Sequence, residues 1–477
     1  MAQPGLNIWA QRLSARPHDP AALSGLAKAL LASNRPQDAA ALLAPRCDQH
    51  PALLRLLARA LLRSGQRGPA IGALFMAEAH TPNDPDLPGE LADALFTDGQ
   101  PEAALPYART AWHTDPSPDH AATLSCILLD LGQQDEALSV TDAALARNRR
   151  APAIWTNRSI ALEGLGRMDE AIAAARNALR HAPDSAFARH HLATALLADS
   201  QLTPEAWRLY EARLALDGVR PLPQSRRWHP GMPAGTVLLH AEQGLGDTLQ
   251  FVRYAPLVAA QSTRVILAVQ PALVRLLRGT PGVDAIIPTG SLLPPFDSVA
   301  PLLSLPGLFG TTLGTIPKPL PYANLTPHPA PGPALRAGLV WAGSTGFVAD
   351  AKRSLPEAML APLCTIPGIT LFSLQLGATP QPGITDLMPG ARDMADTAAR
   401  IAGLDLVISV DTAVAHLAAT MGKTTWLLSR HRGCWRWLRD RDDSPWYPTL
   451  RIFRQEQPGN WAGVVTRVRQ ALVSGPV

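Results

Sequence analysis

The chain has 477 residues, of which 47% are hydrophobic, so it is long enough to form two or three structural units with separate cores. Its formal net charge of +4 is small for this length and no nucleic-acid-binding motif accompanies it, which argues against DNA or RNA as a partner. No stretch approaches the roughly 20 apolar residues needed to span a bilayer, and residues 1–20 lack the apolar run of a secretion signal. We therefore expect a cytoplasmic protein.

The spacing of the four cysteines also favours the cytoplasm. They are far apart in the sequence and form no CxxC pair, which is typical of a reducing environment and argues against structural zinc. We expect no bound metal and no cofactor.

Residues 18–185 carry a repeated pattern of a helix, a tight turn and a second helix. In the clearest copy, residues 152–184, Gly166 permits the turn, Ala171 and Ala178 let the second helix approach the first closely, and Pro183 ends it. The turn position recurs every 33 or 34 residues at Gly65, Gly99, Gly132 and Gly166, with a weaker copy at Asn34.

A period of about 34 residues with small residues at fixed positions resembles the tetratricopeptide-repeat family. The resemblance implies an all-α solenoid of five degenerate repeats, with a concave groove that holds a protein segment. The alternative is that the groove only stabilises a neighbouring domain or a dimer. Two further helices over 186–216, the second capped by Thr203 and opened by Pro204, are expected to close this domain, which we place at 1–217.

A proline-rich linker, residues 218–234, leads into alternating strands and helices. Strand patterns at 237–239, 264–270 and 283–288 form one series, and those at 337–344, 369–375, 405–410 and 424–429 form a second. We predict two lobes, 235–330 and 331–477, with ligands at the carboxyl ends of their strands.

Three sequence blocks in this half carry a second resemblance. The runs HAEQGLGDTLQFVRY, GLVWAGS followed by KRSLP, and LDLVISVDTAVAHLAATMGK are similar to blocks of bacterial repeat-containing glycosyltransferases related to the heptosyltransferases. The resemblance implies the GT-B architecture of two facing Rossmann-like lobes. It also implies that the first lobe supplies the acceptor chemistry and that the second holds a nucleotide-sugar donor.

Asp247 is the candidate catalytic base, because GLGD places a carboxylate after a strand and at the start of a helix. The resemblance assigns it this role and places it in an acceptor-side loop with Gln243, Gly244 and Gly246. The alternative is that Asp247 only satisfies free N–H groups at the helix start.

Candidate donor-binding residues follow the strands of the second lobe. The loop that opens the helix after 405–410 is a ready anion site, and cations nearby could balance the charge of a leaving phosphate without a metal. These residues are Gly343, Ser344, Lys352, Arg353, Gln375, Asp411, Thr412, Ala413 and His416. For His416 the alternative is a histidine packed against the sheet, and for Lys352 and Arg353 it is a solvated pair of charges.

Two stretches depart from the family pattern. Leu376 stands where relatives continue with Lys, and the run 430–434, with three cationic or titratable side chains and Cys434, replaces a stretch expected to be more apolar. The first departure removes one possible donor-binding cation, and the second would alter donor specificity. The Trp-rich block that follows could stack on a base or sugar, although we expect at least two of Trp435, Trp437, Trp446 and Tyr447 to be packed.

The two resemblances together imply an inverting, metal-independent glycosyltransferase whose repeats present a protein acceptor, so that Asp247 activates a Ser or Thr hydroxyl. Flagellin or another surface protein is a candidate acceptor because related repeat-fused transferases modify such proteins, although no residue identifies it, and a glycan acceptor remains an alternative. The competing hypothesis is a repeat-based protein-binding adaptor whose transferase-like domain is catalytically inactive.

Overall fold

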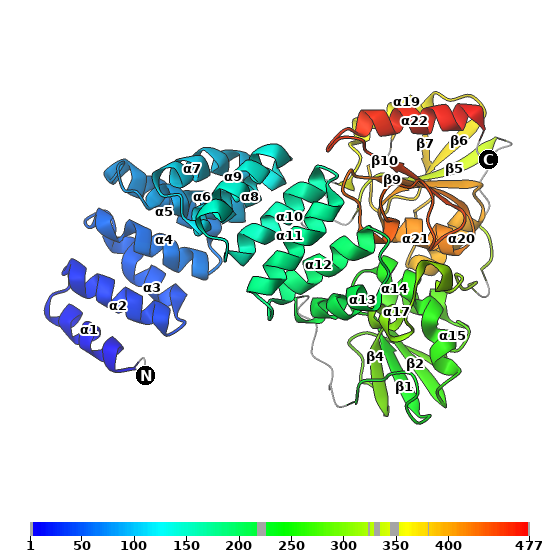
Figure 1. Ribbon diagram of the computed structural model, residues 1–477, viewed down its shortest axis with the longest axis horizontal. Helices are drawn as coiled ribbons and strands as arrows, with labels where there is room; N and C mark the ends of the chain where they lie inside the picture. The colour runs from blue at the N-terminus through cyan, green and yellow to red at the C-terminus, as the bar shows by residue number, and fades with distance from the viewer. Residues whose placement is uncertain are drawn as a thin grey trace. The chain divides into compact units, whose positions relative to one another are not determined.

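The computed structural model describes residues 3–216, 226–322, 325–328, 334–343, 353–379 and 381–475. The chain divides into two compact units, Met1–Ala182 and Pro183–Val477. Figure 1 shows the first as a series of helices coloured blue to cyan, and the second as a mixed α/β unit in green to red.

The first unit is a stack of antiparallel helix pairs preceded by α1 (Gln3–Ala15). Its described part contains five pairs, as the sequence predicts. They are α2 (Pro20–Ala32) and α3 (Pro36–Leu43), α4 (Leu54–Arg63) and α5 (Arg67–His80), α6 (Leu87–Thr97) and α7 (Pro101–Thr114), α8 (Pro118–Asp130) and α9 (Gln134–Arg147), and α10 (Pro152–Gly164) and α11 (Met168–His181).

The turn inside each pair has left-handed backbone geometry. The residues and their φ angles are Asn34 at 56°, Gly65 at 80°, Gly99 at 81°, Gly132 at 74° and Gly166 at 76°. Glycine adopts this conformation without steric cost and asparagine at little cost, which is why these two residue types recur there. Small side chains such as Ala171 and Ala178 are fully buried between the paired helices. The predicted repeat lattice is confirmed.

The second unit begins with a helical hairpin, α12 (Ala186–Ala198) and α13 (Pro204–Tyr210), followed by the 3-10 helix η3 (Glu211–Ala215). Thr203 caps α13 through a hydrogen bond from the N–H of Ala206, 3.2 Å, as predicted. The predicted boundary at residue 217 assigns this hairpin to the repeats, but the structure assigns it to the second unit. The reason is visible at Trp207, whose indole donates to the carbonyl of Thr311 (2.8 Å) and packs edge-on against Trp435, 5.8 Å between ring centres.

The first sheet of this unit has four parallel strands in the order β3-β2-β1-β4. The strands are β1 (Thr236–His240), β2 (Arg264–Val269), β3 (Ala285–Pro288) and β4 (Ser298–Pro301), and the helices are α14 (Leu245–Phe251), α15 (Ala255–Ala259), α16 (Pro271–Leu277) and α17 (Leu305–Leu308). The sequence predicts β1 to β3 from their apolar runs. It misses β4, because SVAP is short and ends in proline.

The second sheet has six parallel strands in the order β10-β9-β8-β5-β6-β7. The strands are β5 (Leu335–Val340), β6 (Ile369–Ser373), β7 (Ile384–Asp386), β8 (Leu406–Val410), β9 (Thr424–Ser429) and β10 (Leu450–Arg454), with helices α19 (Ala361–Cys364), α20 (Met394–Ala402), α21 (Ala413–Thr420) and α22 (Trp461–Ser474). A core that includes Leu339, Ile408 and Trp426 lies on one face, under α22. The edge strands β7 and β10 escape the sequence pattern.

Helices that follow strands of different sheets meet each other. The helix after β1, α14, packs against α21, which follows β8, and α16 packs against α20. In Figure 1 α14 and α21 lie next to each other. Because both helices start at the carboxyl ends of parallel strands, the loops at those ends of the two sheets are brought together.

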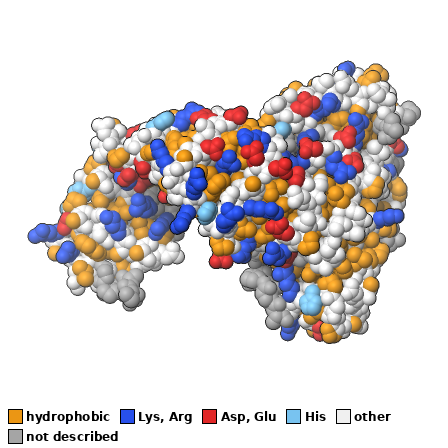
Figure 2. Space-filling model, viewed as in Figure 1, with side chains coloured by type: hydrophobic (Ala, Val, Ile, Leu, Met, Phe, Trp, Pro, Cys, Tyr) orange, Lys and Arg blue, Asp and Glu red, His pale blue; other side chains and the backbone are white. Residues whose placement is uncertain are grey.

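No helix in the described ranges has the length and apolar character that a bilayer crossing requires. Basic and acidic side chains are both scattered over the face drawn in Figure 2, in keeping with the small net charge of the chain.

Candidate functional site

Asp247 lies in the first turn of α14, and both of its carboxylate oxygens have protein partners. Oδ2 accepts a hydrogen bond from the N–H of Gly244, 2.9 Å, and Oδ1 forms an ion pair with Arg436. The first contact is of the kind that the helix-start alternative describes. The side chain keeps 18% of its surface exposed, so a small molecule can still approach it.

Arg436 joins the two sheets at this point. It lies in the 3-10 helix η9 (Trp435–Trp437), in the segment after β9, and its side chain is 8% exposed. Its Nη2 also faces the hydroxyl of Tyr210 at 3.4 Å and the side-chain oxygen of Gln243 at 3.5 Å. The charge of Asp247 raises the pKa of Arg436 although burial opposes this, so the guanidinium stays charged.

Gly246 on α14 and His416 on α21 lie close together. A Cβ placed on Gly246 would lie 2.7 Å from Cδ2 of the His416 ring, a distance that carbon atoms do not tolerate. Only glycine at position 246 therefore allows α14 to lie this close to His416, which belongs to α21.

His416 itself is a packed residue. It is buried, its Nδ1 is 2.9 Å from the hydroxyl of Tyr447, and its ring lies 4.8 Å from that of Trp437. Burial, together with the charges of two nearby arginines, lowers the pKa of His416 to about 3, so the imidazole is neutral at ordinary pH. This arrangement matches the packing alternative for His416.

An arginine-rich cluster surrounds Asp411, directly after β8. Burial raises the pKa of the Asp411 carboxyl, while the positive charges of Arg436, Arg353 and Arg430 act in the opposite direction. Burial lowers the pKa of Arg430, Cys434 and the charge of Asp411 oppose this, and the charges of Arg432 and Arg353 lower it again. The charges of several arginines thus act on one buried carboxylate at the carboxyl end of β8, and positive charge at such a position favours an anionic ligand.

The start of α21 adjoins this cluster. Thr412 occupies the position before the helix and its Oγ1 lies 2.9 Å from the hydroxyl of Ser409, while Ala413 is the first residue of the helix. Backbone N–H groups at a helix start favour anions. The structure therefore brings Arg353, Asp411, Thr412 and Ala413 together.

The remaining donor-side candidates have other roles or lie outside the described residues. The N–H of Gly343 donates to the hydroxyl of Ser354 at 3.2 Å, and the side-chain oxygen of Gln375 accepts from the N–H of Ala342 at 2.9 Å. Both bonds hold the loop after β5. Ser344 and Lys352 lie outside the described residues.

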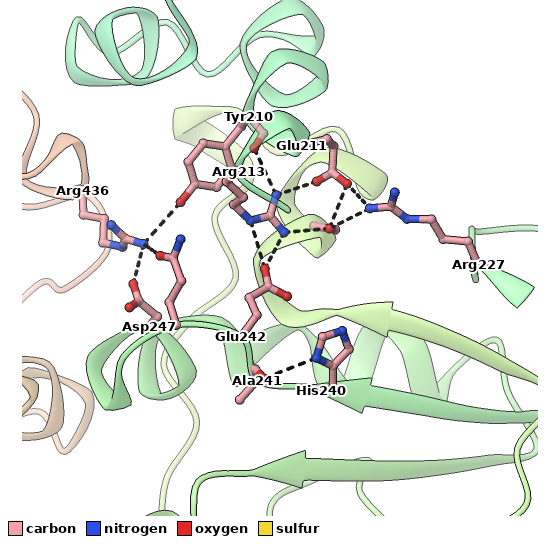
Figure 3. A network of polar contacts seen from close by, with 11 residues as sticks. Tyr210, Glu211, Arg213, Arg227, His240, Ala241, Glu242, Asp247 and Arg436 are labelled. Atoms are coloured by element: carbon pink, nitrogen blue, oxygen red, sulfur yellow. Dashed lines mark hydrogen bonds and ion pairs between the residues drawn. The ribbon is translucent and has the colours of Figure 1, made fainter. Parts of the chain in front are cut away.

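On the first sheet, the loop after β1 is also tied to the helical hairpin. The fully buried guanidinium of Arg213 donates to Oε1 of Glu242, with Nε at 3.0 Å, and a second nitrogen of Arg213 bonds the same oxygen. Figure 3 shows this network running from Arg436 and Asp247 past Tyr210 to Arg213, Glu242 and Arg227. Burial raises the pKa of Glu242 to about 7, against the opposing charge of Arg213.

Sequence reasoning missed Arg436, Tyr210, Arg213 and Glu242. Glu242 precedes the predicted loop by one residue, and its position beside a glycine-rich turn was a usable signal. The other three residues come from segments that no local pattern places near Asp247. The Trp-rich block is packed more completely than expected, since Trp435, Trp437, Trp446 and Tyr447 are all buried.

Among the residues that the structure describes, no three His, Cys, Asp or Glu side chains converge as the ligands of a metal ion would.

Comparison with known proteins supports the repeats. Residues 123–186 match the model of a tetratricopeptide repeat. Protein FlbA of Caulobacter vibrioides is 26% identical over 499 residues, which cover 87% of this chain and 83% of FlbA.

Among solved structures, YrrB, described as a tetratricopeptide-repeat protein with an unusual peptide-binding site, is 18% identical with a TM-score of 0.34, over 38% of this chain and 96% of YrrB. A thermophilic protein of the same repeat type from Thermus thermophilus is 25% identical with a TM-score of 0.31, over 34% of this chain and 89% of its own. The family match shows that the chain carries tetratricopeptide repeats, which are protein-interaction modules, and a unit with two parallel sheets follows them.

Proposed function

We propose that the second unit is a glycosyltransferase of the GT-B type that moves a sugar from a nucleotide-sugar donor to an acceptor hydroxyl. The observation that carries the proposal is the meeting of the two sheets at their carboxyl ends, where Asp247 after β1 is paired with Arg436 after β9. Ligands of parallel α/β sheets bind at that end of the strands, and two sheets sharing one such region suit a reaction between two substrates.

The arginine-rich cluster supports an anionic donor. A nucleotide leaving group gains negative charge as the bond to the sugar breaks, and fixed arginines stabilise that charge without reorganisation. Arg353 and Arg430 lie where their charges act on Asp411, beside the start of α21. In the proposed reaction this cluster holds the donor phosphates.

Asp247 is the proposed base. As a carboxylate it accepts the proton of the acceptor hydroxyl while the oxygen attacks the anomeric carbon, and the nucleotide leaves from the opposite face with inversion. Its contacts with Gly244 and Arg436 fix its direction. The base therefore needs no rearrangement of the loop before it acts.

The repeats are the proposed acceptor-binding part. Tetratricopeptide repeats bind protein segments in their groove, and a Ser or Thr hydroxyl of such a segment is the proposed acceptor, flagellin being one candidate. A glycan acceptor would instead make little use of the repeats.

One observation favours the second candidate function, an adaptor with an inactive transferase-like unit. Asp247, Gln375 and the N–H of Gly343 all have partners within the protein, as purely structural residues would. The two functions differ in donor binding, which only the enzyme requires.

The test is to titrate the purified full chain with nucleoside diphosphates and nucleotide sugars that differ in base and sugar, and to follow the melting temperature. We expect a concentration-dependent rise with one class of nucleotide. No rise with any of them would favour the adaptor.

A further inference from the structure

The helical hairpin that opens the second unit contributes side chains to the loop that carries the proposed base. It lies outside both sheets, and its last residue, Tyr210, together with Arg213 in the following 3-10 helix η3, points into the region beside Glu242 and Arg436 (Figure 3). These side chains take no direct part in the proposed reaction. Their contacts show how the loop that carries Asp247 is held.

Arg213 holds the start of the loop. Its guanidinium has no exposed surface, and besides Glu242 it donates to Oε1 of Glu211 at 2.8 Å, to the hydroxyl of Ser304 at 2.9 Å and to the carbonyl of Tyr210 at 3.3 Å. A guanidinium is a rigid planar fork, so this set of partners fixes the position of Glu242 relative to the hairpin.

Tyr210 reaches the other end of the loop through Arg436. Its hydroxyl accepts from Nη2 of Arg436, the nitrogen that also faces Asp247, and its ring lies edge-on to Trp435 at 5.4 Å. The guanidinium of Arg436 in turn lies 4.7 Å from the centre of the Trp435 ring. Arg436 is therefore held by Tyr210 and Trp435 as well as by Asp247.

Burying this many charges is a costly way to stabilise a fold. Removing an ion pair from water costs several kcal/mol per ion, and apolar side chains of similar volume often stabilise a core as well or better. A network that fixes both Glu242 and Asp247 at the ends of one short loop instead gives the loop a single geometry.

We propose that Arg213 and Tyr210 are positioning residues of the transferase site: Arg213 acts through Glu242, and Tyr210 acts through Arg436, to set the direction of Asp247. This inference rests on the proposed function. It makes the hairpin, which precedes the sheets in sequence, part of the catalytic unit.

The test measures release of nucleotide from a nucleotide sugar by the full-length chain, with kcat and KM for the donor. We expect Arg213→Lys and Glu242→Gln each to lower kcat by roughly 10- to 100-fold, and Tyr210→Phe by a smaller factor of about 3 to 10, because misplacement of a catalytic group by about 1 Å has effects of this size. KM for the donor should change less than about twofold, since the donor is held by the other sheet.

Arg227→Lys is the matched control. Arg227 belongs to the same network, where it pairs with Glu211, but it does not contact the loop at 241–247 in the structure. Its kcat should stay within about twofold of the original chain. In the double variant Arg213→Lys with Glu242→Gln, the fall in kcat should be far smaller than the product of the two single falls. The reason is that both changes break the same contact, between Arg213 and Glu242.

The outcomes separate the two levels of the proposal. Turnover by the original chain with kcat unchanged in Tyr210→Phe and Glu242→Gln overturns the positioning inference alone, as do independent effects in the double variant. A rise in the KM for the donor that accompanies the fall in kcat would indicate a merely structural role for these residues, and it would also overturn the positioning inference. Failure of the original chain to bind or turn over any nucleotide sugar overturns the proposed function. Should Arg213→Lys fail to fold, Tyr210→Phe, which removes one oxygen atom, decides the question.

Discussion

The carboxylate of Asp247, in the first turn after the glycine loop of one parallel sheet, is ion-paired with Arg436, which follows a strand of the other sheet. The pair is largely buried, and Arg436 is further held by the ring of Trp435. Several consequences for binding, turnover and stability depend on this contact and on its neighbours.

Asp247→Asn should keep donor binding and lower the rate of transfer by about 10²- to 10⁴-fold, because it removes the proposed base and preserves the shape of the side chain. Kinetics with saturating donor and a dissociation constant for the nucleotide measure the two effects. Asp405→Asn is the control, since Asp405 pairs with Arg336 on the second sheet and has no proposed role in the reaction. Unchanged turnover in Asp247→Asn would remove Asp247 from the mechanism.

Gly246→Ala should lower the free energy of unfolding by roughly 1–3 kcal/mol, because the added methyl would meet the buried ring of His416. Gly314→Ala is the control: nothing lies within 4 Å of a Cβ at that position. Denaturant melts of both variants provide the measurement. Equal stability of the two variants would mean that position 246 has room for a side chain.

Much of the fold could be predicted because it depends on local pattern. A few adjacent residues determine each of the turn glycines, the cap at Thr203 and the apolar strands. The edge strands β7 and β10 could not, since ITD is three residues long and LRIFR mixes charged with apolar positions.

For the candidate site, the sequence could predict which residues lie in each loop but not which distant residues contact them. The sequence places Asp247 after β1 and Asp411 after β8, because strand and helix patterns flank them. It does not show that Arg436 contacts Asp247, or that Arg213 contacts Glu242, because these partners come from distant segments and depend on tertiary packing. For the same reason the helical hairpin was assigned to the repeats and not to the unit on which it packs.

Arg430→Gln should weaken binding of the nucleoside diphosphate by roughly tenfold or more, since a hydrogen bond or ion pair to a charged group contributes about 1.5–3 kcal/mol. Arg430 is one of the cations that act on Asp411. Arg451→Gln, which changes an exposed side chain on the edge strand β10, is the matched control and should leave the affinity unchanged. Calorimetric titration gives both values. Equal affinities would place the donor phosphates elsewhere.

Glu242 should make stability depend on pH near neutrality. Its pKa is raised by burial from 4.5 to about 7 in the folded chain, so the folded state holds the proton more tightly than the unfolded state. The resulting stabilisation is fully present below pH 4.5 and is lost as the pH rises through about 7.

The measurement is the difference in free energy of unfolding between the original chain and Glu242→Gln, taken from about pH 4.5 to about pH 8, over which glutamine does not titrate. We expect this difference to fall as the pH rises. A difference that is constant or increases with pH would contradict the assignment.

Deletion of residues 1–182 removes the first compact unit at its observed boundary. If the repeats present the acceptor, the shortened chain should lose transfer to a protein far more than it loses release of nucleotide from the donor into water. Both rates are measured on the same preparation. Equal losses would indicate that the repeats only support the fold of the second unit.

The central claim is that the chain transfers a sugar to a protein. Its most direct test is intact-mass spectrometry of candidate acceptor proteins, flagellin among them, isolated from cells with the original chain and from cells that carry Asp247→Asn. We predict a mass increment, equal to one or more sugar residues on Ser or Thr, that is present with the original chain and absent with the variant. Identical acceptor masses in the two strains would contradict the account.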